Sequence, residues 1–380
     1  MQNCFSKYED GYERFLESNG SVFFFWKGRV AIYVLLKAIG VGSGDEVILP
    51  GFTCVVVPNA VLYLGAKPVY ADIDPQTYNI TAETIEPLIS PRTKVIIAQN
   101  TFGLSPDLDP IMALAEQHGI YVIEDCAHGL GSTYKGRPAG TSTHASFFST
   151  QWSKPISTGL GGIAYVRDEV LVHKVAAIVE QLTPPRMMEQ AILAAQVFVR
   201  PLANRPALYY PLVEAYRFLT QKVGLSVGSS VGDELLSVQM PHGYLKRMGG
   251  FQRRALQRGL KTLPQRVRQR QLVAEQYDTF FRNTAIQPSA RPDYAEHSML
   301  RYPIRVPDKA KILERARRLR IPVGDWFVSP LHPVEGELSQ WGYQAGQCPE
   351  AEKACAEVIN LFTDHALSHQ QLSALFDGML

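Results

Sequence analysis

Lys154 follows Asp125 by 29 positions, and three glycines, Gly159, Gly161 and Gly162, come soon after the lysine. A lysine amine can form an imine with an aldehyde, and a buried carboxylate can keep the nitrogen of a pyridine ring protonated. Pyridoxal phosphate (PLP) needs both groups from its protein if the ring is to take up electrons from a carbanion. The pair therefore predicts a PLP site in which Lys154 and Asp125 are the catalytic residues.

Asp125 closes an apolar run that contains Ile120, Val122 and Ile123, so we expect it at the carboxyl end of a buried parallel strand. Open α/β sheets bind ligands at that edge. A buried carboxylate there needs a cation or a hydrogen-bond donor, and a protonated pyridine nitrogen is one such partner. Capping of the next helix, or pairing with an arginine, is the alternative. Ala127, two residues later, is small enough to lie flat beneath an aromatic ring.

Two segments have the groups that bind a phosphate. The hydroxyl of Ser149, five residues before Lys154, is one donor, and the glycines after Lys154 would let backbone amides approach the same group. Gly28, Arg29 and Val30 open a predicted helix, whose first N–H groups and dipole attract an anion, and Arg29 adds a guanidinium. The alternatives are a surface arginine in a first helical turn and a solvent-facing loop lysine.

The elements that must position these residues follow an alternating pattern. Short apolar runs predict strands at 46–50, 67–73, 93–99, 120–125, 145–149 and 162–166. Amphipathic runs predict helices at 29–39, 58–66, 81–89 and 107–119. This alternation is typical of an α/β fold in which a mostly parallel sheet is covered by helices on both faces.

The rest of the chain predicts a second domain and an insertion. We expect a large domain over residues 1–275, with a helical insertion at about 167–245, and a smaller C-terminal α+β domain over 276–380. In the smaller domain the patterns predict a strand at 301–306 and helices at 309–324, 350–361 and 369–379. The insertion has aromatic residues beside basic ones. We expect it to cover the mouth of the site or to widen a dimer interface, and contact with a membrane surface or a lipid-linked substrate is the alternative.

Composition excludes several classes. The chain has 380 residues and a formal net charge of +2, which gives no overall reason to expect nucleic acid or an anionic membrane as a partner. Five cysteines without CxxC spacing, and a polar start without a signal-peptide core, are typical of a cytoplasmic protein with reduced thiols. Adjacent residues of a strand point to opposite faces, so Glu124 and Asp125 are not expected to share a metal ion.

Four stretches of the sequence are typical of one enzyme family. Residues 44–80, 91–103, 118–140 (HGIYVIEDCAHGLGSTYKGRPAG) and 148–162 (FSTQWSKPISTGLGG) closely resemble the DegT/StrS-type sugar aminotransferases. The resemblance implies a fold type I PLP enzyme, usually a homodimer with its active sites at the subunit interface. Such enzymes move an amino group from glutamate or glutamine to a keto-sugar, commonly a nucleotide-linked one, in amino-sugar, glycan or antibiotic biosynthesis.

The resemblance also assigns roles to residues. It implies that Lys154 is the Schiff-base lysine and proton carrier, that Asp125 is the partner of the pyridine nitrogen, and that Ser149 binds the phosphate. His128 stands where the family often has a glutamine that hydrogen-bonds the phenolic oxygen of the cofactor, and an imidazole can do the same. A core histidine without a catalytic role is the alternative for His128.

The sequence departs from the family pattern at several positions. Arg29 replaces a threonine that binds phosphate, and Leu245 replaces an asparagine that reaches the partner subunit's site, where Lys246 is a possible substitute. Cys54 replaces the aromatic residue that often stacks on the cofactor, so stacking must come from elsewhere, with Phe52 or Phe102 as candidates.

These departures indicate a divergent member of the family. Two alternatives stay open: another PLP chemistry on sugars, as in the related dehydratases and deoxygenases, and a non-catalytic regulatory protein that keeps the fold. In the dehydratases and deoxygenases that this chain resembles, a histidine replaces the lysine, so Lys154 speaks against that alternative. A basic stretch over 246–270 is expected to be a solvated or dimer-interface helix, or else a binding surface for an acidic partner or a sugar nucleotide's diphosphate.

Overall fold

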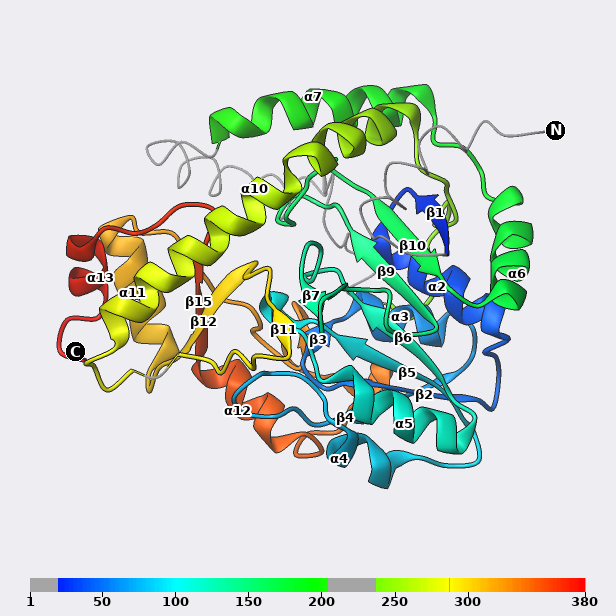
Figure 1. The fold of residues 1–380 in the computed structure, drawn as a ribbon, viewed down its shortest axis with the longest axis horizontal. Coiled ribbons are helices and arrows are strands. Elements are labelled where there is room, and N and C mark those ends of the chain that lie inside the picture. Colours follow the sequence, from blue (N-terminus) through cyan, green and yellow to red (C-terminus); the bar gives the residue numbers. More distant parts are fainter. Residues whose placement is uncertain (1–19, 204–236, 287, 380) are drawn as a thin grey trace.

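A computed structural model of the chain describes residues 20–203, 237–286 and 288–379. At the centre of the large domain lies a seven-stranded sheet in the order β1-β10-β9-β6-β5-β2-β4 (Figure 1). Its strands are β1 (Ser21–Phe25), β10 (Gly162–Val166), β9 (Ala145–Ser149), β6 (Tyr121–Asp125), β5 (Thr93–Gln99), β2 (Glu46–Pro50) and β4 (Lys67–Ala71). The five strands from β9 to β4 are parallel, whereas β10 is antiparallel to both of its neighbours. The predicted, mostly parallel sheet is confirmed.

Helices flank this sheet. Helix α2 (Gly28–Ile39) packs on β9 and β10 and against α3 (Val56–Leu62) and α6 (Glu169–Glu180), and α5 (Leu108–His118) packs beside β6. In α2 every residue except Lys37 is buried, because its sequence is apolar on nearly all sides. The predicted helix 81–89 is shorter than expected: α4 (Ala82–Ile85) is followed by the 3-10 helix η1 (Glu86–Leu88), which has a proline inside it.

Short elements complete the large domain and link it to the small one. Strand β3 (Thr53–Cys54) pairs in parallel with β14 (Leu331–His332), and β7 (Thr133–Tyr134) lies between β8 (Arg137–Pro138) and β11 (Ala295–Glu296). The other 3-10 helices of the described residues are η2 (Thr101–Gly103) and η3 (Ser339–Trp341).

The small domain has a three-stranded antiparallel sheet, β12 (Arg301–Arg305), β15 (Val358–Phe362) and β13 (Val323–Gly324), with helices α11 (Lys309–Leu319), α12 (Pro349–Glu357) and α13 (His369–Leu375). The prediction of a helix over 350–361 was wrong for its last part. The segment VINLF forms β15, which is buried between two strands. The helix predicted over 309–324 ends at Leu319, where Arg320 adopts a left-handed conformation.

The long helix α10 (Gly250–Phe281) joins the two domains and runs diagonally across the molecule (Figure 1). The predicted boundary after residue 275 falls inside this helix, and its position stays a prediction. The basic stretch within α10 is not wholly solvated: Arg270 is buried and donates to the Leu300 carbonyl at 3.0 Å and to Thr363 Oγ1 at 2.8 Å.

Helices α6 and α7 (Met187–Ala203) lie in the predicted insertion and agree with its expected helical character. Leu193 of α7 packs with Trp26 and Leu160 of the large domain. Residues 204–236, which include most of the insertion's aromatic residues, lie outside the described part of the chain. Within the described ranges, no helix is both long and apolar enough to cross a membrane.

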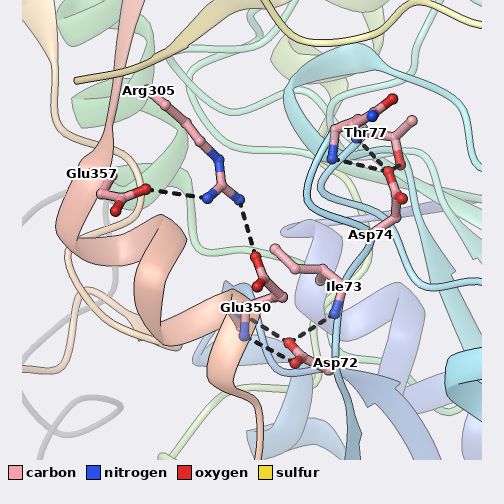
Figure 2. Close-up of polar contacts among 9 residues, drawn as sticks. Asp72, Ile73, Asp74, Thr77, Arg305, Glu350 and Glu357 are labelled. Atoms are coloured by element: carbon pink, nitrogen blue, oxygen red, sulfur yellow. Dashed lines mark hydrogen bonds and ion pairs between the residues drawn. The ribbon is translucent and has the colours of Figure 1, made fainter. Parts of the chain in front are cut away.

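Polar contacts fasten α12 to both domains (Figure 2). Asp72, which follows β4, accepts hydrogen bonds from the Glu350 and Ala351 N–H groups, each at 2.9 Å. Arg305 of β12 pairs with Glu357 at 3.2 Å and with Glu350 at 3.7 Å. A carboxylate at a helix N-terminus satisfies N–H groups that have no partner within the helix. Helix α12 is therefore held at its start by the large domain and along its length by the small domain.

Candidate active site

A cavity of about 340 Å³ lies at the carboxyl ends of β6 and β9, beside the start of α2. Seven of the eight predicted site residues line it: Gly28, Arg29, Asp125, Ala127, His128, Ser149 and Lys154. The eighth, Val30, does not line the cavity. Other lining residues come from the small domain, among them Trp326, Phe327 and His332. The structure thus brings together residues that are far apart in the sequence, at the sheet edge where α/β folds bind ligands.

Asp125 is the last residue of β6 and is 3% exposed. Its Oδ1 accepts a hydrogen bond from the Ala127 N–H at 2.8 Å. Residues 127–131 form turns, so the carboxylate does not cap a following helix. Burial raises the pKa of Asp125 to about 7, and the nearby Lys154 lowers it by less. A buried carboxyl with one backbone donor is suited to a cationic partner in the cavity.

Glu124 points to the other face of the sheet. Its Oε1 accepts from Asn100 Nδ2 at 2.9 Å, and its Oε2 accepts from the Gly140 N–H at 2.8 Å. These bonds satisfy a buried carboxyl away from the cavity. Glu124 and Asp125 therefore serve different environments, as the alternation along a strand predicts.

Lys154 lies in the loop between β9 and β10. The loop is closed by the Thr150 N–H, which donates to the Gly161 carbonyl at 3.0 Å, and by the Thr158 N–H, which donates to the Thr150 carbonyl at 2.9 Å. A Cβ atom on Gly161 would lie 2.1 Å from Thr150 Oγ1, so this close approach requires glycine. Burial among protein atoms lowers the pKa of Lys154 to about 8, despite the opposing effect of Asp125. Much of the amine is then neutral near pH 8.

The start of α2 meets the end of β9 closely. A Cβ on Gly28 would lie 3.1 Å from Ser149 Cβ, which is tighter than an ordinary contact, and a Cβ on Gly162 would lie 2.3 Å from the Lys27 carbonyl oxygen. Glycine at both positions therefore lets a helix N-terminus, a hydroxyl and the guanidinium of Arg29 share one cavity. Gly161 and Gly162 thus have a packing role, and the contact of the glycine amides with a phosphate stays a prediction.

Val30 is placed differently from the other two residues at the helix start. Its side chain is fully buried in the core, and its N–H donates to the Lys27 carbonyl at 3.1 Å. At the start of α2, Gly28 and Arg29 thus line the cavity and Val30 does not. Lys246, a possible substitute for a phosphate ligand, is paired with Glu189 of the same chain at 2.6 Å.

His128 has a defined tautomer. Its Nδ1 accepts a hydrogen bond from the Phe102 N–H at 3.2 Å, and burial lowers the pKa of the imidazole well below its usual value. The ring is therefore neutral with its proton on Nε2, which makes Nε2–H a donor. The indole of Trp326 stacks on this imidazole, with ring centroids 5.2 Å apart and an angle of 12° between the planes.

The two candidates for stacking on the cofactor do not reach the cavity. Phe52 and Phe102 are both fully buried and pack with Phe327, at centroid distances of 4.8 Å and 6.0 Å. Cys54 does line the cavity, as its position in the family pattern predicts. Trp326 was missed by the sequence analysis, because a Trp-Phe pair between a short strand and a proline gives no periodic signal.

The lining residues fit PLP. A buried carboxyl is present for a ring nitrogen, an amine for an aldehyde, and a helix N-terminus with Arg29 and Ser149 for a phosphate. His128 adds a neutral N–H donor. Each polar group of PLP thus has a residue of matching chemistry on the wall of one cavity.

Comparison with known proteins places the chain in a family. The sequence matches the DegT/DnrJ/EryC1/StrS aminotransferase family over residues 5–195 and 213–379. The chain belongs to this family. The match covers most of the large and the small domain, so it includes every residue described above as lining the cavity.

Similar family proteins differ in how much of the chain they match. GDP-perosamine synthase of Caulobacter vibrioides is 42% identical over 147 residues, which are 39% of this chain and 40% of that protein. The chain thus matches about two fifths of the length of this relative. A pleiotropic regulatory protein of Geobacillus stearothermophilus is 29% identical over 337 residues, which are 88% of this chain and 77% of that protein.

Solved structures share the fold. The Streptococcus pneumoniae protein Spr1654, solved in its PLP form, has a TM-score of 0.73 and 21% identity, and the superposition covers 100% of this chain and 91% of that one. At this level of identity the likeness concerns the fold. It confirms the fold type I architecture of the large and small domains in this DegT-type chain.

Proposed function

We propose that this protein is a PLP-dependent aminotransferase that transfers an amino group from glutamate or glutamine to a nucleotide-linked keto-sugar. One observation carries the proposal: Lys154 and Asp125 line the same cavity as the anion-binding groups Arg29 and Ser149. Family membership and the name of the relative GDP-perosamine synthase support the amino-sugar assignment. The reaction belongs to the synthesis of an amino sugar, a glycan or an antibiotic precursor.

PLP, when bound, supplies a ring that takes up the electrons of a carbanion. Asp125 has the charge to hold a proton on the ring nitrogen, and its burial strengthens that interaction. His128 would donate from Nε2–H to an oxygen on the ring, because its Nδ1 already accepts from the Phe102 N–H. Gly28, Arg29 and Ser149 would hold the phosphate.

Lys154 has the role of proton carrier. A group that takes a proton from carbon and returns it must be partly neutral at the working pH. The lowered pKa of Lys154 provides this state, and the closed loop from Thr150 to Gly161 holds the residue at the cavity. The amine can therefore accept and deliver a proton at Nζ without leaving the site.

The regulatory alternative has one specific observation in its favour. The relative that matches 88% of this chain is named a pleiotropic regulatory protein. The complete set of Asp125, Ser149 and Lys154 in one cavity favours catalysis instead. The dehydratase and deoxygenase alternative is disfavoured by the lysine at position 154.

The proposal extends to assembly and location. We infer a homodimer with its active sites at the subunit interface, in keeping with the family pattern. We also infer a cytoplasmic location, because Cys54, Cys126, Cys348 and Cys355 are free thiols, as is usual in a reducing compartment.

Two measurements test the proposal. Incubation with PLP followed by borohydride should add the mass of the reduced cofactor to the tryptic peptide that contains residue 154. Isotope exchange between glutamate and 2-oxoglutarate should then be detectable in the wild type and absent in Lys154→Ala. Lys311→Ala, at an exposed position of α11, is the matched control and should exchange normally. PLP attachment without exchange would favour the regulatory alternative, and exchange by Lys154→Ala would refute the role of the lysine.

A further inference from the structure

Among the phenyl and indole rings of described residues that line the cavity, one is partly exposed, and the small domain provides it. Among the described residues that line the cavity, the phenyl rings of Phe147 and Phe327 are each 3% exposed, whereas Trp326 is partly exposed. The centroid of the Trp326 ring lies 5.4 Å from Lys154 Nζ. On the same indole, Arg301 Cζ lies 4.8 Å from the ring. Any group that reaches the Lys154 amine must therefore fit beside this indole.

Three consecutive backbone carbonyls around Trp326 are held by buried side chains. Lys309 Nζ donates to the carbonyls of Asp325 at 3.1 Å and Phe327 at 2.9 Å. Asn360 Nδ2 donates to the carbonyl of Trp326 itself at 3.1 Å. The third hydrogen bond of the Lys309 ammonium, to the Cys355 carbonyl at 2.8 Å, anchors it to α12.

This arrangement is unusual for a lysine. A lysine is rarely buried without an anionic partner, and Lys309 is 8% exposed with three carbonyls as its neighbours. A buried ammonium is costly unless its N–H groups are hydrogen-bonded. A movement of residues 325–327 would break two of the three bonds of Lys309, so the ammonium holds this segment in place. The indole is thereby fixed relative to α11 and β15, the elements that carry Lys309 and Asn360.

We propose that Trp326 is a specificity-determining residue of the site, which limits the size of the group that reaches Lys154, and that Lys309 and Asn360 are positioning residues that hold the indole in place. Cys54 is small where the family pattern has an aromatic residue, so the indole is the main aromatic surface that a substrate meets. A flat indole also suits the apolar face of a sugar ring. The role in specificity rests on the proposed function, whereas the shielding of the Lys154 amine by the indole can be tested without it.

The first experiment needs no catalysis. Full-length protein without PLP is treated with formaldehyde and cyanoborohydride, and the methylation of each lysine is followed by peptide mass spectrometry. In Trp326→Ala, the amine of Lys154 should be modified several-fold faster than in the wild type. Lys311, which is exposed on α11, serves as the internal standard and should be modified equally in both. Equal rates at Lys154 would overturn the proposal, whether or not the protein proves to be an aminotransferase.

The second experiment measures specificity. Single-turnover reactions of the PLP-loaded protein with L-glutamate and with the bulkier L-phenylalanine are followed by the cofactor absorbance. Trp326→Ala should raise the rate with phenylalanine relative to that with glutamate by about tenfold, as expected when a steric limit is removed. An unchanged ratio would overturn the role in specificity. A wild type that reacts with neither donor would count against the proposed function, and the methylation result would still decide the position of the indole.

The role of Lys309 is tested by combining its substitution with that of Trp326. Lys309→Met keeps the length of the side chain and removes its three donors, and it should change the phenylalanine-to-glutamate ratio in the same direction as Trp326→Ala. In the double variant the second substitution should add nothing, since Lys309 acts through the indole. Additive effects would refute this role, and Lys311→Met is the matched control. If Lys309→Met does not fold, Asn360→Ala takes its place, because it removes the bond to the Trp326 carbonyl and leaves the three bonds of Lys309 intact.

Discussion

Asp125→Asn removes a buried charge and keeps the shape of the side chain and its acceptor for the Ala127 N–H. Burial raises the pKa of Asp125 from 3.8 to about 7. The folded apoprotein therefore keeps a proton that the unfolded chain has lost, and this group makes stability fall as pH rises from about 4 to about 7. This pKa difference corresponds to roughly 4 kcal/mol of unfolding free energy, which the wild type should lose over this pH range and the asparagine variant should keep.

The assay is denaturant unfolding of the apoprotein across this pH range, with wild type and variant measured in parallel. The free energy of unfolding of Asp125→Asn, relative to the wild type, should rise with pH between about 4 and 7. The lowered pKa of Lys154 makes the stability of the wild type rise above about pH 8. The variant lacks the Asp125 charge that opposes this lowering, so Lys154 adds to the expected rise and does not hide it. Asp293→Asn, at an exposed site, is the control. A difference that is constant with pH would refute the argument from the buried charge.

The same variant tests the role of Asp125 in the loaded protein. Loss of one member of a buried charge pair costs about 3–5 kcal/mol, which corresponds to a rate loss of roughly 100- to 5000-fold. The rate of the reaction with glutamate should fall by this factor, while borohydride still fixes PLP to Lys154. A rate within about threefold of the wild type, a change too small to represent a lost charge pair, would show that Asp125 does not serve the ring nitrogen.

Three further changes have defined outcomes. Arg29→Met should weaken PLP binding by roughly 10- to 100-fold, because hydrogen bonds to a charged group contribute about 1.5–3 kcal/mol; a PLP titration measures this, with the exposed Arg92→Met as the control. His128→Leu leaves the buried Phe102 N–H without its acceptor and should lower the free energy of unfolding by about 1–3 kcal/mol, whereas His128→Gln, whose amide can accept this bond and donate another, should lose less. Asp72→Ala should lower it by about 1–2 kcal/mol in the same denaturation assay, because the first turn of α12 loses its acceptor.

The sheet could be predicted because its strands are buried on both faces and read as short apolar runs. The strands expected at 46–50, 93–99, 145–149 and 162–166 have those bounds in the structure. Residues 358–361, most of β15, are assigned to a helix by the sequence pattern because a short apolar run gives no clear period. Pairing with β12 and β13 decides its conformation, and those partners lie far away in the sequence.

The site could be predicted where a side chain and its environment are close in sequence. Asp125 ends its own strand, and Lys154 and Ser149 belong to the same loop and strand end. Val30 shows the limit of this reasoning, because the sequence does not reveal that its N–H bonds to the Lys27 carbonyl. The contact between Trp326 and His128 joins residues of different domains, and no local pattern predicts such a pair.

Cys54, a departure from the family pattern, and Trp326 line the same cavity. Cys54 lies on β3, which pairs in parallel with β14, and the loop that carries Trp326 leads directly into β14. The position that lost an aromatic residue and the loop that supplies one are thus fixed to each other by backbone hydrogen bonds, and both line the cavity beside Lys154. A small residue at position 54 is compatible with an indole that enters from the small domain. The chemistry set by Asp125 and Lys154 can stay the same, while the residues at positions 54 and 326 change the shape of the cavity that the acceptor enters.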